Sequence, residues 1–460
     1  MKYRINLRRF FALPLTGLVL SALITHAADL SKQPARTSPD WLRNGVIYQI
    51  FPRDFSAAGN LNSVTAKLDQ LKDLGVTVLW VMPIHPIGEK GRKGDYGSPY
   101  SIKDYYAVDP NYGTLDDFKK LVAGAHQRGL KVIMDLVANH TSWDSVMMTN
   151  KAFYKQDAQG NVISPDPGWT DVAGLNYANS QLREYMIAMM NYWIQTCDLD
   201  GFRCDVAWAV PTDFWEQARA ALEKTKPDIM MLAEASKPDL LTNAFDVDYS
   251  WPLLHTLNDV FMRGAPASNL PGTWQDDVKQ FPQNALHMRI SDDHDESRAI
   301  ARYGINGALA AQVLMFTLDG VPLLYNGMEV GDATESGDPA LFDKLPIVWA
   351  PRERPPFRDI YRSLIRLRKQ YPAFSDNSVS WLHNSNEAML LSFMRSDKTD
   401  QFVVVINCSN RPVSGSVKIE NGPDFQPVRI SGIPDSHDCS LPQFHLNAYE
   451  WRIYHRTLQP

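Results

Sequence analysis

The chain has 460 residues, of which 44% are hydrophobic and 21% are charged. This composition is typical of a packed globular protein and excludes a largely disordered chain. The formal charge of −6 argues against a dedicated nucleic-acid-binding protein. At roughly 150 residues per domain, the length allows about three domains or one large barrel with additions.

The first 27 residues have the features of a secretory signal peptide. Residues 1–9 carry four basic residues and no acidic one, residues 10–24 form an apolar run, and residues 25–27 offer a small-residue cleavage site. The run is short for a membrane-spanning helix, so cleavage is favoured over an N-terminal membrane anchor. The pair Arg8-Arg9 also hints at twin-arginine export. We therefore expect a secreted or periplasmic protein that has no membrane contact once this segment is removed.

Strands and helices alternate from about residue 41 to residue 370. A strand buried on both faces gives a continuous apolar run, and a helix packed on a sheet gives apolar residues at helical spacing. These patterns predict strands at 46–51, 76–82, 130–137, 201–206, 229–234, 245–249, 286–290 and 321–325. They predict helices over 64–74, 114–128, 182–193, 213–223, 307–318 and 359–369. Thr114 and Asp117 form a capping box at the start of the second of these helices.

Residues 141–178 interrupt the alternation. They are rich in Asp, Asn, Pro and Gly and too long for an ordinary loop, so we predict a small inserted subdomain. About eight strand–helix units fit either a closed barrel or an open doubly wound sheet. No Gly-rich phosphate loop follows the first strand, which counts against a dinucleotide-binding sheet. After about residue 373, short strand patterns at 387–393, 402–407, 414–419, 427–430 and 445–454 replace the helical spacing.

The predicted fold class is therefore α/β. We expect a (β/α)8 TIM barrel over residues 41–372. The subdomain at 141–178 is inserted after the third strand. A C-terminal antiparallel β-sandwich is expected over residues 373–460.

Acidic residues stand at the carboxyl ends of the predicted barrel strands. Asp135, Asp205 and Glu234 end three of them, and the loop at 292–295, Asp-Asp-His-Asp, follows the seventh. Barrel enzymes build their active sites at this face, so these side chains are candidates for one site.

Arg203 and Asp205 lie two residues apart on a strand, so their side chains share a face and point into the barrel mouth. A guanidinium beside a carboxylate favours the ionised form, which suits a nucleophile. Glu234 follows the apolar run 230–233 and has no basic neighbour nearby in the chain, which favours a protonated general acid. One charged and one protonated carboxylate is the arrangement that retaining glycosidases use.

Each of these residues also has a structural reading. Arg203 and Asp205 suit an ion pair that closes the barrel, and Glu234 suits a strand-end residue bonded to a loop. His140 and His294 each fit a buried, hydrogen-bonded histidine. A solvated loop is the favoured reading for Asp292. The joint occurrence of all these residues favours the catalytic reading.

Four motifs resemble those of the α-amylase family of glycoside hydrolases, family 13. They are residues 135–140 (DLVANH), 201–205 (GFRCD), 233–234 (AE), and 294–295 (HD) with Arg298 behind them. Residues 97–100 with Asp104-Tyr105 resemble the loop that carries the family's sugar-stacking tyrosine. Residues 321–329 resemble its eighth strand, and the resemblance extends over about residues 41–455.

The resemblance implies a role for each matching residue. Asp205 is the implied nucleophile and Glu234 the implied acid and base, while Asp295 holds sugar hydroxyls more tightly in the transition state. Arg203 is implied to orient and stabilise Asp205. His140 and His294 are implied to bond hydroxyls of the sugar at the cleavage point, and Tyr100 to stack on it.

Three positions depart from the family pattern. Asp293 stands where the family usually has Asn, which adds a carboxylate. Gly174 precedes Leu175-Asn176 where the family has its calcium-binding aspartate, and Ala209 replaces a histidine that often follows the nucleophile. Asn139 alone makes a poor site for a cation that takes six or more oxygens. We therefore expect no metal and no other cofactor.

The sequence thus predicts a retaining hydrolase of α-1,4 bonds in starch-derived maltooligosaccharides. A family member that prefers cyclodextrins or transfers glycosyl units is the close alternative. A non-catalytic glucan-binding protein is disfavoured because Asp205 and Glu234 are both present, and a dehydrogenase is disfavoured by the missing Gly-rich loop. The expected partner is the glucan, and the oligomeric state is left open.

Two further expectations concern Trp208 and the four cysteines. Trp208 lies three residues past Asp205, where it fits either acceptor-side sugar binding or a core position at the barrel rim. Export permits disulfides, and a Cys408–Cys439 bridge is predicted, with Cys204 free. A Cys197–Cys204 bridge and four reduced thiols are the alternatives.

Overall fold

The computed structural model describes residues 29–350, 356–375, 378–433 and 440–458. The predicted signal peptide lies outside the described residues. Within those ranges, every helix is too short or too polar to cross a membrane.

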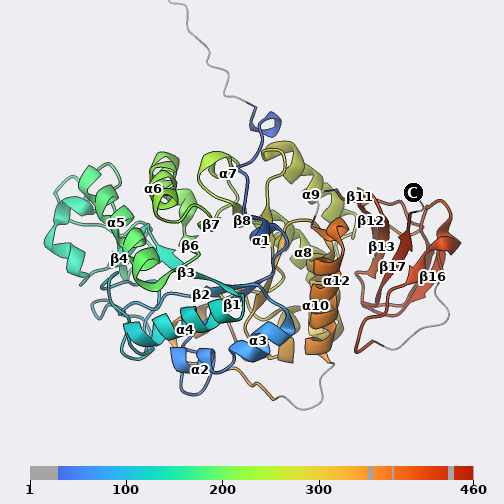
Figure 1. Ribbon diagram of the computed structural model, residues 1–460, viewed down its shortest axis with the longest axis horizontal. Coiled ribbons are helices and arrows are strands. Elements are labelled where there is room, and N and C mark those ends of the chain that lie inside the picture. The colour runs from blue at the N-terminus through green and yellow to red at the C-terminus, as the bar shows by residue number, and fades with distance from the viewer. Residues whose placement is uncertain (1–28, 351–355, 376–377, 434–439, 459–460) are drawn as a thin grey trace, which may run out of the picture.

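Eight parallel strands close into a barrel at the centre of the molecule (Figure 1), in the order β1-β10-β9-β8-β7-β6-β3-β2. The first strand pairs with both the second and the last, which closes the barrel. The predicted (β/α)8 barrel is confirmed. The strands are β1 (Ile47–Ile50), β2 (Val78–Val81), β3 (Lys131–Val137), β6 (Gly201–Asp205), β7 (Met230–Ala233), β8 (Val247–Tyr249), β9 (His287–Arg289) and β10 (Val321–Tyr325).

Helices cover the outside of the barrel, which is why almost every strand residue is buried. The capping box predicted for α4 is present: Thr114 accepts from the backbone of Asp117 and the Asp117 carboxylate accepts from that of Thr114. The helices are α1 (Asp40–Arg43), α2 (Leu61–Thr65), α3 (Leu68–Leu74), α4 (Leu115–Gln127), α5 (Ser180–Cys197), α6 (Thr212–Thr225), α7 (Leu240–Asn243), α8 (Trp251–Arg263), α9 (Asn269–Gln280), α10 (Ala299–Thr317), α11 (Asp338–Phe342) and α12 (Phe357–Gln370).

Among the longer helices, α8, α9 and α10 differ from the sequence-based expectation. No helix was predicted over α8 or α9, where Pro252 and Pro271 stand. Each proline falls in the first turn, where its missing N–H costs no helical hydrogen bond. The helix predicted from residue 307 begins at Ala299, because α10 continues across a break at Gly304, whose φ is 71°.

The segment after β3 forms the small subdomain. Its strands β4 (His140–Ser142) and β5 (Val172–Gly174) pair antiparallel, so that His140 lies opposite Gly174. Because β4 begins three residues after β3 ends, the subdomain stands directly over the carboxyl ends of the barrel strands. Figure 1 shows β4 at one end of the molecule and the C-terminal strands at the other.

The C-terminal residues form two antiparallel sheets. The larger has the order β11 (Ser380–Trp381), β12 (Leu390–Ser396), β13 (Asp400–Asn407), β17 (Trp451–Thr457) and β15 (Gln426–Pro427), and the smaller pairs β14 (Val413–Ser416) with β16 (Gln443–Leu446). Val403 and Val405 of the larger sheet pack with Phe444 and Leu446 of the smaller. The strand predicted at 445–454 is two strands, because the chain turns at Tyr449, whose φ is 55°.

The three described cysteines form no disulfide with one another. Cys197, Cys204 and Cys408 are free and buried. Cys439 lies outside the described residues. The free thiol of Cys408 disagrees with the predicted Cys408–Cys439 bridge, and the alternative Cys197–Cys204 bridge is absent. The free Cys204 is confirmed.

Candidate active site

Arg203 is the centre of the candidate site. Its Nη1 lies 2.9 Å from Asp135 Oδ1 and 3.0 Å from Asp205 Oδ1, and its Nη2 lies 3.1 Å from Glu234 Oε2. The strands β3, β6 and β7 are neighbours in the barrel, so their final residues converge on this guanidinium. The side chain is fully buried, which makes these contacts strong because little water screens them.

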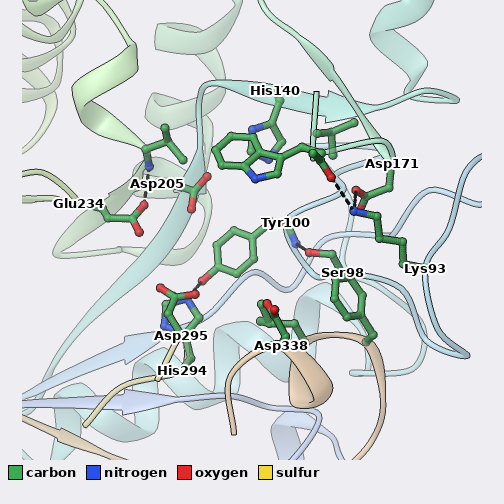
Figure 2. Close-up of a pocket in the computed structure, with 16 residues that line it drawn as sticks. Lys93, Ser98, Tyr100, His140, Asp171, Asp205, Glu234, His294, Asp295 and Asp338 are labelled. Carbon is green, nitrogen blue, oxygen red and sulfur yellow. Dashed lines mark hydrogen bonds and ion pairs between the residues drawn. The ribbon is translucent and has the colours of Figure 1, made fainter. Parts of the chain in front are cut away.

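Glu234 has two donors in contact with its carboxylate. Besides Arg203, the backbone N–H of Val206 donates to Glu234 Oε2 over 2.6 Å (Figure 2). Val206 has a φ of 45°, a left-handed conformation that a β-branched residue rarely adopts. This strained turn, directly after Asp205, aims the N–H at the acid. No basic residue lies near Glu234 in the sequence, but Arg203 reaches it from the adjacent strand.

The carboxylates compete for one cation. Burial, and then the neighbouring Glu234 carboxylate, raise the pKa of Asp205 well above its usual value, while Arg203 opposes the rise. Arg203 thus stabilises the Asp205 carboxylate against the effects of burial and of Glu234.

A chain of hydrogen bonds runs from Gln49 through His294 and Tyr100 to Asp135. The Gln49 amide donates to His294 Nδ1 over 2.7 Å, so the ring proton is on Nε2, which lies 2.6 Å from the Tyr100 hydroxyl. The Tyr100 hydroxyl in turn donates to Asp135 Oδ2 over 3.2 Å. Burial lowers the pKa of His294 to about 3, so its ring is neutral. These bonds fix the orientation of Tyr100 at the floor of the cavity.

Asp295 and His140 complete the predicted set. Asp295 Oδ2 lies 3.3 Å from His294 Nε2, and burial raises the pKa of Asp295 to about 6. His140 packs edge-on against Trp169, with ring centres 5.6 Å apart, and burial lowers its pKa to about 4.

These residues line one cavity of ≈ 500 Å³ (Figure 2). This volume is typical of small-molecule sites. The cavity brings together six predicted residues, namely Tyr100, His140, Asp205, Glu234, His294 and Asp295. Arg203 lies beneath it. Trp208 is not among the lining residues.

Trp208 lies in a short 3-10 turn, Ala207–Ala209, after β6, and is 59% exposed. The alternative that Trp208 is a core residue at the barrel rim is therefore wrong. Its role in acceptor binding stays a prediction.

The loop after β9 is more buried than expected. Asp292 is 3% exposed and accepts from the backbone of Ala299, so a solvated loop is wrong for it. Asp293 Oδ1 accepts from the backbone N–H groups of Asp295 and Glu296, over 3.0 and 3.1 Å. Burial, and then Asp295, raise the pKa of Asp293 well above its usual value. This shift favours the neutral carboxyl form, which is close in shape to the Asn amide that the family usually has there.

Several residues of the site were not predicted from the sequence. Asp135 was placed in a motif but given no role, although it anchors both Arg203 and Tyr100. Gln49 is a polar residue inside a buried strand, which was the available signal. Trp169 and Lys93 line the cavity from long loops, where the sequence has no period to read.

The residues near the family's calcium position have other partners here. Asn139 Nδ2 lies 3.4 Å from His140 Nδ1. A Cβ at Gly174 would lie 3.2 Å from the backbone of Pro165. Among the described residues, one group of three potential metal ligands occurs, Asp293–Asp295, and it belongs to the site just described.

The family model of the alpha-amylase catalytic domain matches residues 49–161 and 168–401. The chain belongs to the alpha-amylase family. It is therefore a glycoside hydrolase, as the motifs predicted.

Among curated relatives, the alpha-amylase MalA of Haloarcula japonica is 27% identical, and the match covers 85% of this chain and 59% of that protein. A cyclomaltodextrinase of Geobacillus thermopakistaniensis is 26% identical over 84% of this chain and 71% of its own. Among solved structures, a noncanonic maltogenic alpha-amylase, AmyB of Thermotoga neapolitana, is 30% identical with a TM-score of 0.82, covering 91% of this chain and 100% of that one.

Proposed function

We propose that the protein is an exported, retaining hydrolase of α-1,4 bonds in starch-derived maltooligosaccharides. The proposal rests mainly on one observation. Asp205 and Glu234 both contact the Arg203 guanidinium. They line the same cavity as Tyr100 and Asp295. The relatives named for amylase activity support the glucan substrate. The signal-peptide features of residues 1–27 support export.

In the first step, an Asp205 oxygen attacks the anomeric carbon while the bond from that carbon to the leaving oxygen breaks. Glu234 gives its proton to the leaving oxygen, so a neutral sugar departs and a glycosyl ester of Asp205 remains. In the second step, Glu234 takes a proton from water, whose oxygen attacks the same carbon and releases Asp205. Two inversions keep the α-anomer. Arg203 stabilises the carboxylate that is charged at each stage.

We also propose that this reaction needs no calcium. Ca²⁺ takes six or more oxygen ligands. At the positions that match the family's site, Asn139 contacts His140, and residues 174 and 209 are Gly and Ala, which offer no side-chain oxygen. This donor set does not fit the ion.

The proposal is tested with Asp205→Asn and Glu234→Gln. Each should lower kcat on maltoheptaose by at least about a thousandfold while the circular dichroism spectrum stays unchanged. An α-glucosyl fluoride separates the roles, because fluoride leaves without protonation: Glu234→Gln should still release fluoride in a first turnover, and Asp205→Asn should not. NMR of the wild-type reaction should show the α-anomer first, and an initial β-anomer would contradict the retaining mechanism.

A second candidate function is cyclodextrin opening or glycosyl transfer. The exposed indole of Trp208, close in the chain to Asp205, favours it, because an acceptor sugar packs well on a flat apolar face. Chromatography of the products from maltoheptaose and from β-cyclodextrin distinguishes the two functions. Products longer than the substrate would indicate transfer.

A further inference from the structure

The cavity has two distinct ends. Figure 2 shows Glu234 at one end and Lys93 with Asp171 at the other, with Asp205 and Tyr100 between them. Under the proposed function, on which this inference rests, Glu234 protonates the leaving oxygen, so the leaving sugars lie on its side. The sugars that stay attached to Asp205 must therefore extend toward Lys93.

Four residues meet at that end, and we call them the Lys93 clasp: Lys93, Gly168, Asp171 and Phe342. The Lys93 ammonium lies 3.1 Å from Asp171 Oδ1 and donates to the Gly168 carbonyl over 3.2 Å. It also stands 5.9 Å from the centre of the Phe342 ring. The clasp thus joins the loop after β2, the small subdomain and the end of α11, three segments that are far apart in the sequence.

The backbone packs as closely as the side chains at this end. The N–H of Tyr96 donates to the Phe342 carbonyl over 3.0 Å. Gly94 has a φ of 64°, and a Cβ there would lie 2.6 Å from that of Phe342. On the other side, a Cβ at Gly91 would lie 3.6 Å from the Cα of Asp171. The loop therefore fills the space between subdomain and barrel, where a longer glucan chain would have to pass.

One donor of the clasp remains for a ligand. An ammonium has three N–H groups, and Asp171 and Gly168 take two of them. Lys93 lines the cavity and its side chain is 36% exposed, whereas that of Asp171 is 8% exposed. The third N–H thus faces a space where the last sugar of the bound chain would present its hydroxyls.

We infer that the Lys93 clasp closes the cleft and binds the non-reducing end of the glucan, so that the enzyme cuts short units from chain ends. A cavity of ≈ 500 Å³ suits a ligand of about di- or trisaccharide size. Maltose or maltotriose is therefore the expected product. A cyclodextrin has no chain end to place against Lys93, so it should react more slowly than a linear chain of the same length.

The test compares maltoheptaose with maltoheptaose whose terminal non-reducing hydroxyls are bridged by an ethylidene group. The wild-type enzyme should cleave the blocked substrate at least about a hundredfold more slowly, because the ethylidene group adds bulk to the terminal sugar oxygens that must approach Lys93 at a closed end. Equal rates on both would overturn the clasp while leaving the proposed hydrolase intact. No hydrolysis of either would instead contradict the proposed function.

Lys93→Ala removes the ammonium and opens this end, and Lys90→Ala, an exposed lysine in the same loop, is the matched control. The ratio of unblocked to blocked rates should fall at least about tenfold in Lys93→Ala and stay at the wild-type value in Lys90→Ala. Longer products should also appear in the chromatogram of Lys93→Ala. An unchanged ratio in a folded Lys93→Ala enzyme would contradict the inference.

Discussion

Arg203 sets the charge balance of the site at the scale of single residues. It is one buried cation in contact with three carboxylates, and Asp295 lies close by. Burial raises the pKa values of Asp135 and Asp295 to about 6, even though Arg203 opposes the rise in both. These two carboxyl groups should therefore take up protons at a higher pH than aspartate usually does.

Trp208 is predicted to bind sugars on the acceptor side of the site. Because the indole is 59% exposed, Trp208→Ala should change the free energy of unfolding by less than about 1 kcal/mol. If the indole binds acceptor sugars, KM for maltoheptaose should rise several-fold while hydrolysis of an activated aryl glucoside stays near wild type. Trp208→Phe should restore much of the loss. An equal loss on both substrates would contradict an acceptor role.

His85 gives a pH-dependent prediction. Its Nδ1–H donates to the Ala107 carbonyl over 3.0 Å, and burial lowers its pKa to about 4. A lowered pKa stabilises the fold above the unfolded value of about 6.5, and this contribution is lost as the pH falls toward 4. Between pH 7 and pH 5 the loss is about 2 kcal/mol.

In His85→Phe the ring still packs beside Trp193, but it cannot be protonated. The difference in unfolding free energy between wild type and variant should therefore shrink by about 2 kcal/mol from pH 7 to pH 5. Urea unfolding at the two pH values measures this. A difference that stays constant would show that His85 remains neutral in the unfolded chain or charged in the fold.

At the scale of elements, the small subdomain makes a prediction about metals. Near the cavity, the subdomain is held by a contact between protein side chains, the Lys93–Asp171 ion pair. Prolonged dialysis against EDTA should therefore leave both the melting temperature and the activity on maltoheptaose unchanged. A fall in melting temperature that added Ca²⁺ reverses would contradict this. Enzyme dialysed without chelator is the control.

The barrel strands could be predicted because they are buried on both faces. Runs such as 76–82 and 130–137 have no polar alternation, and a carboxylate follows where the third, fourth and fifth strands end. The helices α8 and α9 were not predicted; each has a proline in its first turn, where the missing N–H costs no helical hydrogen bond. Gln49 and His294, 245 residues apart, meet only because the closed barrel brings β1 close to the loop after β9. No local pattern contains that contact.

At the scale of the whole molecule, the barrel and the C-terminal sheets share one core. Phe393, Phe402 and Ile453 of the larger sheet belong to the same cluster of buried residues as the barrel helices. Two buried arginines bond to the carboxyl end of α10, one from the larger sheet and one from a barrel helix. Arg395 of β12 donates to the carbonyl of Thr317 over 2.9 Å, and Arg368 of α12 donates to that of Leu318 over 3.1 Å. Both cations stand at the carboxyl end of α10, where the helix dipole favours positive charge.

Because the core is continuous, calorimetry should show one unfolding transition for the barrel and the C-terminal sheets together. Arg395→Met leaves the buried carbonyl of Thr317 without this donor, which should cost about 1–3 kcal/mol and lower that single transition as a whole. Arg411→Met, at an exposed position between β13 and β14, is the control and should leave the transition in place. Since Arg395 is remote from the cavity residues in the fold, kcat below the transition should be unaffected. Two separate transitions in the wild-type protein would show that the sheets fold independently of the barrel, and the shared core would then contribute little to holding the catalytic strands.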